Sequence, residues 1–210
     1  MRRTVVLCLL AASAALGQDP CKLEFENEWV RVSRVSYAPF GKSKTHDHPA
    51  YPTVYVYTTD GGPIRFRHND GIEVDRGEVK AGGIRFNRGM AERHEVESLS
   101  DIPSEYLRIE LKTEPLELPA RDIRIPPTEN RGFENAQVRI EKLTCAAHQK
   151  CGISELASVI VNLEDRNPTW IHKESPVFEN TTDQPLKLIR VALKSAPRGL
   201  QASSSKTGRP

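Results

Sequence analysis

The feature that most constrains the fold of this chain is an internal repeat. Residues 25–32 match residues 133–140 at an offset of 108, and residues 101–112 match residues 183–194 at an offset of 82. The second copy is therefore shorter than the first by 108 − 82 = 26 residues, which is the length of a hairpin missing from its middle. The repeat predicts two related halves, of which the second is a degraded copy of the first.

Both copies consist of short runs in which apolar and polar residues alternate, which is the pattern of β-strands. Leu107, Ile109 and Leu111 alternate with charged residues, and residues 53–57 form a β-branched and aromatic run. Turn residues bound these runs, and the chain holds 13 Gly and 15 Pro. No stretch predicts a long amphipathic helix, since even residues 153–163 have a Val-Ile-Val centre that favours a strand. The expected fold is an all-β sandwich or barrel.

Five segments are expected along the chain. Residues 1–17 have the features of a signal peptide, and residues 18–112 form the first barrel. Residues 113–132 contain four prolines, which cannot donate to a sheet ladder, so they predict an extended connector. Residues 133–194 form the shortened second copy. Residues 195–210 have almost nothing apolar to bury and are expected to be a disordered tail.

The N-terminal segment predicts export. Two arginines precede an apolar run of 12 residues, and Ala15-Leu16-Gly17 fits the small-x-small rule for signal peptidase. Because a spanning helix needs roughly 20 residues, we expect cleavage after Gly17 and no stable membrane insertion afterwards. The expected location of the mature protein is secreted or periplasmic.

Export would place the rest of the chain in an oxidising compartment, where disulfides persist. Cys8 leaves with the signal, and Cys21, Cys145 and Cys151 remain. Three cysteines allow at most one intramolecular disulfide. We expect Cys145 to pair with Cys151 across a short loop, with Cys21 as a competing partner.

The charge balance excludes some classes of partner. The chain has 30 Lys+Arg and 28 Asp+Glu, and removal of Arg2 and Arg3 with the signal leaves 28 against 28. Proteins dedicated to nucleic acids or anionic membranes need clustered excess basic residues. We therefore expect that neither a nucleic acid nor an anionic membrane is the partner.

Two closely spaced histidines are the first candidates for chemistry. His46 and His48 are separated by one residue, so on a strand their imidazoles point to the same face. Two neutral imidazole nitrogens on one face are ligands of the kind that divalent metals bind in proteins. Such a pair also occurs on protein surfaces without a metal. The surrounding sequence is therefore needed to distinguish a metal site from a surface pair.

That context contains two glycine-led blocks. The first runs from Gly41 through His46 and His48, and the second opens at Gly77 and ends shortly after His94. This arrangement resembles the two motifs of the cupin superfamily, in which a His-x-His pair and a later lone histidine form a metal site. Matched residue by residue, His46, His48 and His94 fall on the three histidine positions.

The resemblance covers residues 25–112 well and residues 133–194 as a degraded copy without the His-x-His pair. It implies a small exported bicupin, with cupin-type β-barrels (double-stranded β-helix, jelly-roll-like) in two copies, the second shortened. The second copy is expected to be structural and to pack against the first. The resemblance is compatible with a homodimer.

The chain departs from the cupin pattern at the metal site. The family usually places a glutamate four or five residues after the second histidine, where this chain has Pro52 and Thr53. Three imidazoles can still bind a divalent ion such as Zn, Fe, Mn, Ni or Cu. Such a site keeps the full +2 charge and favours an anionic ligand such as a carboxylate. Three glutamates near His94 are candidate fourth ligands: Glu92, Glu95 and Glu97. The alternative interpretation is that they are solvated charges on an exposed strand.

Two functions from different classes follow. The resemblance implies a metal-dependent oxygenase or isomerase acting on a small anionic compound, with the ion as Lewis acid or oxygen activator. No residue stands out in the sequence as a general base. The alternative is a non-catalytic barrel that binds a small ligand or another protein, which the missing glutamate and the eroded second copy favour. The sequence contains no nucleophile elbow, phosphate loop or dinucleotide fingerprint.

Overall fold

In a computed structural model of the chain, residues 20–114, 122–152, 155–175 and 177–198 are described. All regular structure in these residues is strand, which confirms the expected all-β fold. None of them forms a helix long and apolar enough to cross a membrane. The strands in chain order are β1 (Cys21–Glu26), β2 (Val30–Tyr37), β3 (His46–His48), β4 (Thr53–Tyr57), β5 (Ile64–His68), β6 (Glu73–Arg76), β7 (Ile84–Asn87), β8 (Glu92–Ser98), β9 (Ser104–Leu111), β10 (Ile123–Ile125), β11 (Phe133–Glu134), β12 (Val138–Cys145), β13 (Lys150–Gly152), β14 (Ser158–Asn162), β15 (Pro168–Ile171), β16 (Val177–Glu179) and β17 (Leu186–Leu193).

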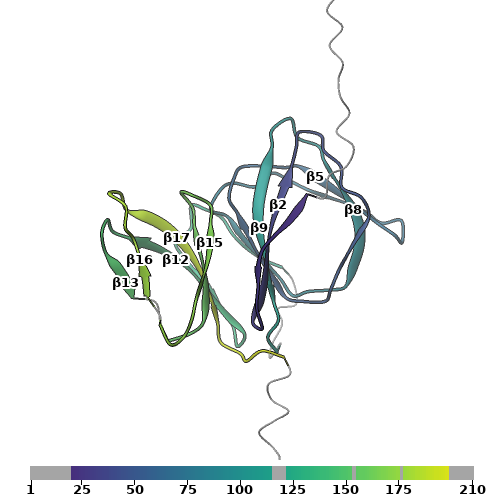
Figure 1. The fold of residues 1–210 in the computed structure, drawn as a ribbon. Helices are drawn as coiled ribbons and strands as arrows, with labels where there is room; N and C mark the ends of the chain where they lie inside the picture. Colours follow the sequence, from purple (N-terminus) through teal and green to yellow (C-terminus); the bar gives the residue numbers. More distant parts are fainter. Residues whose placement is uncertain (1–19, 115–121, 153–154, 176, 199–210) are drawn as a thin grey trace, which may run out of the picture.

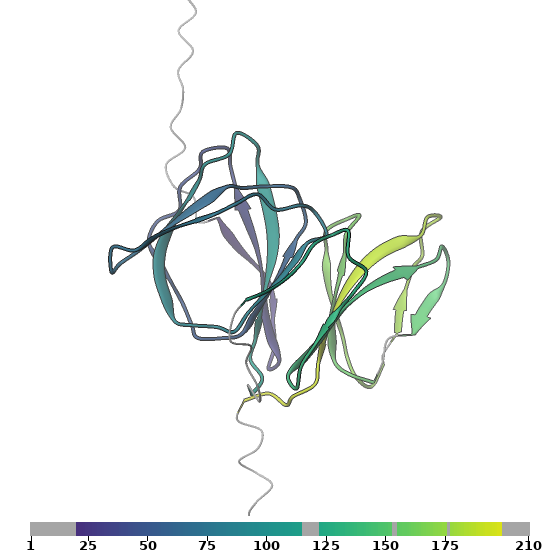
Figure 2. The same ribbon diagram turned by 180° about the vertical axis from the view of Figure 1, so that it is seen from behind.

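The N-terminal half is a barrel built from two antiparallel sheets. A six-stranded sheet has the order β1-β2-β9-β4-β7-β10, and a four-stranded sheet has the order β3-β8-β5-β6. Seen from behind, the strands of this half close around an interior (Figure 2). The predicted hairpin turn joins β5 to β6, where Gly71 has φ +85°, a conformation that L side chains rarely adopt.

The C-terminal half is smaller and lies beside the barrel (Figure 1). Its five-stranded sheet has the order β11-β12-β17-β14-β15, and a two-stranded sheet pairs β13 with β16. The expected disulfide is confirmed, since Cys145 and Cys151 are bonded with their Cα atoms 5.8 Å apart. The disulfide joins the end of β12 to β13, so it ties the small sheet to the large one.

The repeat in the sequence is also a repeat in the strand pairing. In the first half β2 pairs with β9, and Val30 lies opposite Leu111. In the second half β12 pairs with β17, and Val138 lies opposite Leu193. These pairs are related by the two offsets found in the sequence, 108 and 82.

The same asparagine turn precedes both hairpins. Oδ1 of Asn27 accepts hydrogen bonds from the backbone N–H of Trp29 and Val30, at 2.8 and 2.9 Å. Oδ1 of Asn135 accepts from the corresponding N–H groups of Gln137 and Val138, both at 2.8 Å. The matched sequence blocks therefore preserve one local structure.

A single apolar core joins the two halves. It lies between the six-stranded sheet of the barrel and the five-stranded sheet of the C-terminal half, and both contribute fully buried side chains. Trp29 and Trp170 pack at its edge with ring centroids 6.5 Å apart. The expectation that the second copy packs against the first is confirmed. The buried members are Val30, Val32, Val54, Val56, Ile84, Phe86, Leu107, Ile109, Leu111, Ile125, Val138, Ile140, Val159, Val161, Ile189, Val191 and Leu193.

This packing decides which residues enter the barrel. Because the apolar face of β9 is covered by the C-terminal half, its opposite face, with Tyr106 and Arg108, lines the barrel interior. Arg108 and Glu110 are only 7 % and 4 % exposed and lie 3.1 Å apart as an ion pair. The charged positions of this strand therefore face the interior and not the solvent.

Two of the expected boundaries differ from the structure. Residues 123–125, placed in the connector, form β10 and pair with β7 as the sixth strand of the barrel sheet. Their two isoleucines pack on the shared core, which compensates for the prolines on either side. Residues 195–198, placed in the disordered tail, are held by backbone hydrogen bonds, from Glu114 N–H to the Ala196 carbonyl and from Arg198 N–H to the Lys112 carbonyl. Residues 1–17 and 199–210 lie outside the described part of the chain.

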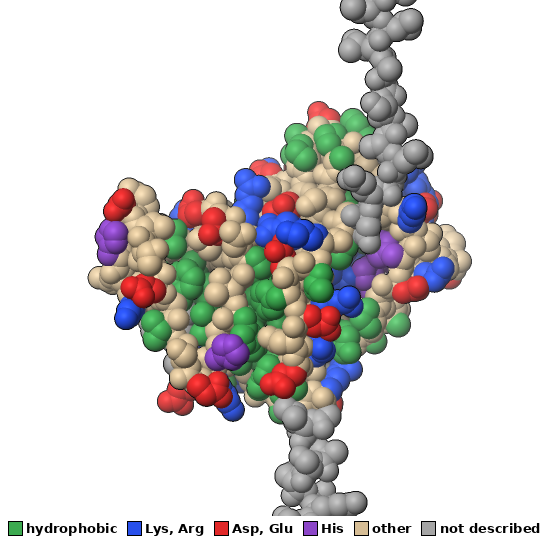
Figure 3. All heavy atoms as spheres, in the orientation of Figure 1, with side chains coloured by type: hydrophobic (Ala, Val, Ile, Leu, Met, Phe, Trp, Pro, Cys, Tyr) green, Lys and Arg blue, Asp and Glu red, His purple; other side chains and the backbone are tan. Residues whose placement is uncertain are grey.

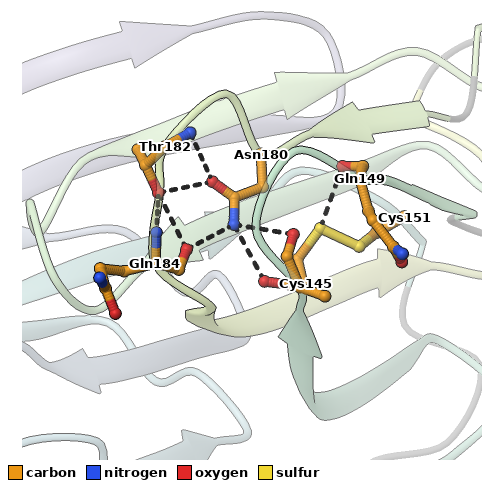
Figure 4. The surroundings of a disulfide bond; sticks show 7 residues. Cys145, Gln149, Cys151, Asn180, Thr182 and Gln184 are labelled. Carbon is orange, nitrogen blue, oxygen red and sulfur yellow. Dashed lines mark hydrogen bonds between the residues drawn. A yellow bond between two sulfur atoms is a disulfide. The ribbon is translucent and has the colours of Figure 1, made fainter.

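Asn180 holds together the loops at the disulfide end of the second half (Figure 4). The side chain is fully buried, and its Nδ2 donates hydrogen bonds to the carbonyl oxygens of Cys145, Ala146 and Gln184 at 2.8–3.0 Å. Asn180-Thr181-Thr182 matches the glycosylation triplet. A glycan would be attached at Nδ2, but in the folded protein this buried atom is already hydrogen-bonded to backbone carbonyl oxygens. Asn180 therefore has a structural role.

Candidate metal centre

The three predicted histidines converge inside the N-terminal barrel. His46 and His48 are on β3, and His94 lies directly opposite His46 on β8. One ring nitrogen of each lies within 4.8 Å of those of the other two. The ring centroids are 4.7–5.0 Å apart in all three pairs. The structure therefore confirms that these residues come together, and their role as metal ligands remains a prediction.

The backbone fixes the orientation of the first histidine. Nδ1 of His46 lies 2.8 Å from the carbonyl oxygen of Lys44. A carbonyl oxygen only accepts, so Nδ1 carries the proton and Nε2 keeps the free lone pair. Metal-ligating histidines commonly have their other nitrogen held by a carbonyl or carboxylate in this way.

Burial keeps the other two imidazoles neutral. Desolvation, with Arg108 nearby, lowers the pKa of His48 to about 3. Desolvation also lowers the pKa of His94, whose side chain is 2 % exposed. The neutral ring is the form that binds a metal. The buried Nδ1 of His94 makes no hydrogen bond within the described part of the chain.

Glu92 is the one of the three candidate glutamates that enters this pocket. It lies opposite His48 in the pairing of β3 with β8, and its Oε2 is 3.4 Å from Nδ1 of His94. The His94 imidazole beside it lowers the pKa of Glu92 to about 2. Glu95 and Glu97 point to the outer face, where both pair with Arg67.

Arg108, which lies on the six-stranded sheet, contacts the ring of His48 on the four-stranded sheet. Its Nη1 lies 2.9 Å from Nε2 of His48 and is also in contact with Nδ1 of the same ring. A guanidinium only donates hydrogen bonds, and it stays charged at any ordinary pH. Arg108 therefore takes up the lone pair of His48 and puts a positive charge beside the cluster.

The pocket continues into a second cavity in the barrel, here called the tyrosine cavity. Five residues line both hollows and form the boundary between them: Tyr37, Tyr55, Phe66, Arg76 and Tyr106. Beyond this layer the tyrosine cavity is lined by Tyr57, Arg85, Ile64 and the loops around Gly62, Gly77 and Ser104. Burial raises the pKa of Tyr37 to about 12 and raises that of Tyr106 strongly, so both hydroxyls remain protonated donors.

The sequence analysis did not identify the interior arginines. Arg85 and Arg108 alternate with apolar residues along their strands, as solvent-facing charges do, and Arg76 follows Asp75 at the end of a strand rich in charge. The repeat could have indicated their inward position. If the two halves pack against each other through the apolar faces of their sheets, the polar face of the barrel sheet is left to line the barrel interior. Histidine side chains are visible at the surface on the barrel side of the molecule in Figure 3.

The remaining histidines lie elsewhere or at the edge of the site. The ring of His68, expected to be a solvated turn residue, is half-buried and 5.3 Å from that of His94. His148 pairs with Asp183 at 2.8 Å in the C-terminal half, and His172 packs against Trp170. Neither belongs to the cluster.

Comparisons with known proteins identify the fold. No protein-family model and no curated protein matches the chain. AerE from Microcystis aeruginosa matches with a TM-score of 0.54 and 13 % identity, over 83 % of this chain and 97 % of that one. YhaK from Escherichia coli matches with a TM-score of 0.53 and 11 % identity, over 82 % and 90 %. A cupin domain from Bordetella pertussis Tohama I is 24 % identical over 45 % of this chain and 97 % of its own, with a TM-score of 0.39.

At these identities the likeness concerns the fold alone. The matches to AerE and YhaK extend over both halves, so other proteins have the same two-part arrangement. The fold of this chain is therefore the two-part, all-β fold that AerE and YhaK share with it. The three histidines within its barrel form a group that could hold a metal ion.

Proposed function

We propose that this chain is an exported, metal-dependent cupin that acts as an oxygenase or isomerase on a small organic anion. His46, His48 and His94 would hold a divalent ion. The observation that carries the proposal is the convergence of three ring nitrogens within 4.8 Å of one another in the lining of a pocket. Neutral imidazoles held by the backbone and by burial are the donor set that such an ion requires.

The chemistry divides between the ion and the side chains around it. A bound divalent ion supplies Lewis acidity or activates oxygen. Glu92 is ionised at neutral pH and holds the imidazole of His94 in orientation, as a carboxylate beside a ligating histidine commonly does. The tyrosine hydroxyls donate hydrogen bonds to a bound anion, and the enclosing rings exclude water from it.

Metal content tests the assignment. Mature protein purified with a divalent metal supplied should contain one equivalent by elemental analysis. His94→Ala should contain none, while His172→Ala, which removes a histidine outside the cluster, should retain the full equivalent. A full equivalent in the His94 variant would show that the site is assigned wrongly. Wild-type protein without metal would leave the alternative, a non-catalytic barrel that binds a small ligand.

Export is a separate part of the proposal, supported by the arginines, the apolar run and the small-x-small site in residues 1–17. Protein made in an exporting host should begin near Gln18. N-terminal sequencing of the exported fraction that finds Met1 retained would contradict it.

A further inference from the structure

The interior of the barrel contains three arginines, and two of them have carboxylate partners. Nε of Arg85 donates to Oδ2 of Asp122 at 2.6 Å, and Arg108 pairs with Glu110 at 3.1 Å. Arg76, at the end of β6, has no carboxylate within ion-pair distance in the described part of the chain. Its guanidinium carbon instead lies 3.9 Å from the centre of the Phe66 ring.

An enclosed guanidinium without an ion-pair partner is costly, because burial penalises its charge, and the charge of Glu92 offsets this only in part. Desolvation lowers the pKa of Arg76, with the charge of Arg85 as the next cause. A ring face beneath the cation compensates in part. Arg76 lies at the boundary between the histidine pocket and the tyrosine cavity and lines both.

Arg85 also lines this cavity, and one of its donors lacks a partner. The residue is 4 % exposed, and its Nη1 is buried without a hydrogen-bond partner within the described residues. The guanidinium carbon lies 5.1 Å from the ring centre of Tyr55. A buried donor without a partner costs free energy unless a ligand or water satisfies it.

The charge inside the barrel points to the same kind of ligand. The three interior arginines are balanced by Glu92, Glu110 and Asp122. Glu105, which also lines the tyrosine cavity, pairs with Arg34 at 2.7 Å. A divalent ion at the histidines would add two positive charges to this balance. A carboxylate bound near Arg76 would offset one of them.

We propose that Arg76, together with Arg85, binds the carboxylate of a small organic acid in the tyrosine cavity. The body of the acid then lies among the aromatic rings, and its other end is directed toward the histidines. Arg76 is thus a specificity-determining residue. This inference deepens the proposed function. The direction of the acid's other end toward the histidines rests on that function. The carboxylate site itself is built from residues that are not in the histidine cluster.

Binding of simple carboxylates to the metal-free protein tests the proposal. The mature chain, stripped of metal, is titrated with formate, acetate, propionate and benzoate, and with the amides of these acids, by calorimetry. We expect at least one acid to bind and its uncharged amide to bind at least tenfold more weakly. If none of the acids binds, or if amide and acid bind equally, the proposal is overturned.

Three variants locate the site. Arg76→Gln should weaken binding of the acid at least tenfold, and Arg76→Lys should restore part of it because the positive charge is kept. Arg88→Gln is the matched control, since Arg88 is exposed and its loss removes one charge from the surface. Unchanged binding in Arg76→Gln overturns the proposal. If Arg76→Gln fails to fold, the Arg76→Lys variant decides. Wild-type affinity in Arg76→Lys would overturn the proposal, because an ammonium cannot replace a bidentate guanidinium without loss of affinity.

The same variants separate this inference from the proposed function. Zinc uptake by Arg76→Gln should equal that of the wild type, since Arg76 is not a ligand. Carboxylate binding that survives in His94→Ala, which has lost its metal, would support the anion site even if the metal assignment failed. Carboxylate binding lost in His94→Ala and retained in Arg76→Gln would place the anion at the histidines and overturn the proposal.

Discussion

Nη1 of Arg108 lies 2.9 Å from Nε2 of His48, so a permanent positive charge is in contact with a ring that the metal site needs. The guanidinium donates to the same lone pair that an ion would use. Arg108 and a metal ion therefore compete for His48, and like charges add a repulsion of their own. The cupin glutamate that would offset this charge is replaced by Pro52 or Thr53.

This competition predicts that Arg108→Gln binds metal more tightly than the wild type. We expect about a tenfold gain in affinity, equivalent to about 1.4 kcal/mol. The change also leaves Glu110 without its ion-pair partner at 3.1 Å, which adds negative charge near the cluster. Affinity is measured by competition for zinc with a chromophoric chelator at neutral pH.

Arg88→Gln serves again as the control for loss of one charge at the surface and should bind zinc as the wild type does. Weaker zinc binding in Arg108→Gln would mean that Arg108 supports the histidines and does not compete with the metal. Thermal unfolding of the metal-free variant shows separately what the buried Glu110 charge, now without its partner, costs in stability.

The strands and their pairing could be predicted from the sequence because their signals are local or repeated. Alternation of apolar and polar residues marks a strand wherever one face is buried. The offsets of 108 and 82 then fix the same register in both halves, as Val30 opposite Leu111 and Val138 opposite Leu193 demonstrate. Convergence of His94 on His46 followed from the resemblance to cupins, since chain spacing alone does not bring them together.

The interior of the barrel could not be predicted in the same way. Alternation shows that a strand has two different faces, but it does not show which face meets a barrel interior. Because the C-terminal half covers Ile109, the charged face with Arg108 turns inward. Parity could have singled out Glu92, which shares the face of His94, whereas Glu95 and Glu97 alternate with it.

The shared core predicts that the two halves unfold together. Ile109 is fully buried between the two sheets, and Ile109→Ala removes methylene and methyl groups that contact both halves. We expect a loss of about 2–5 kcal/mol in the free energy of unfolding, the usual range for such a truncation. Urea unfolding followed by circular dichroism should show one transition in both proteins.

Ile102→Ala is the control, because Ile102 is 45 % exposed and its truncation should change stability by less than about 0.5 kcal/mol. Two separate transitions in the wild type, with only the first shifted by Ile109→Ala, would show that the halves are independent and that the core between them contributes little.

Asn180→Ala should destabilise the C-terminal half. The substitution removes three hydrogen bonds from Nδ2 and leaves the carbonyl oxygens of Cys145, Ala146 and Gln184 without that donor. A loss of at least about 2 kcal/mol is expected, since buried groups left unsatisfied cost about 1–3 kcal/mol each. Thr181→Ala, at an exposed position of the same triplet, should have little effect. Equal stability of both variants would mean that the loops rearrange to satisfy these carbonyls by other donors.

The buried tyrosines predict a loss of stability at alkaline pH. Burial raises the pKa of Tyr37 to about 12, and it also raises the pKa of Tyr57 and Tyr106. In the unfolded chain these phenols titrate near pH 10. Between pH 10 and 12 the unfolded state therefore binds fewer protons than the folded state, so the free energy of unfolding falls as the pH rises. Each such group contributes a slope of up to about 1.4 kcal/mol per pH unit.

Absorbance of tyrosinate near 295 nm checks this directly. In the folded protein the signal of the buried tyrosines should appear only with unfolding, above pH 11, whereas protein unfolded in urea should titrate fully near pH 10. Tyr37→Phe should make the decline in stability between pH 10 and 12 less steep, because one of the groups that drives it is gone. If all five tyrosines of the folded wild type titrate near pH 10, solvent reaches the tyrosine cavity freely, and the enclosure that both the anion site and the raised pKa of Tyr37 require does not exist.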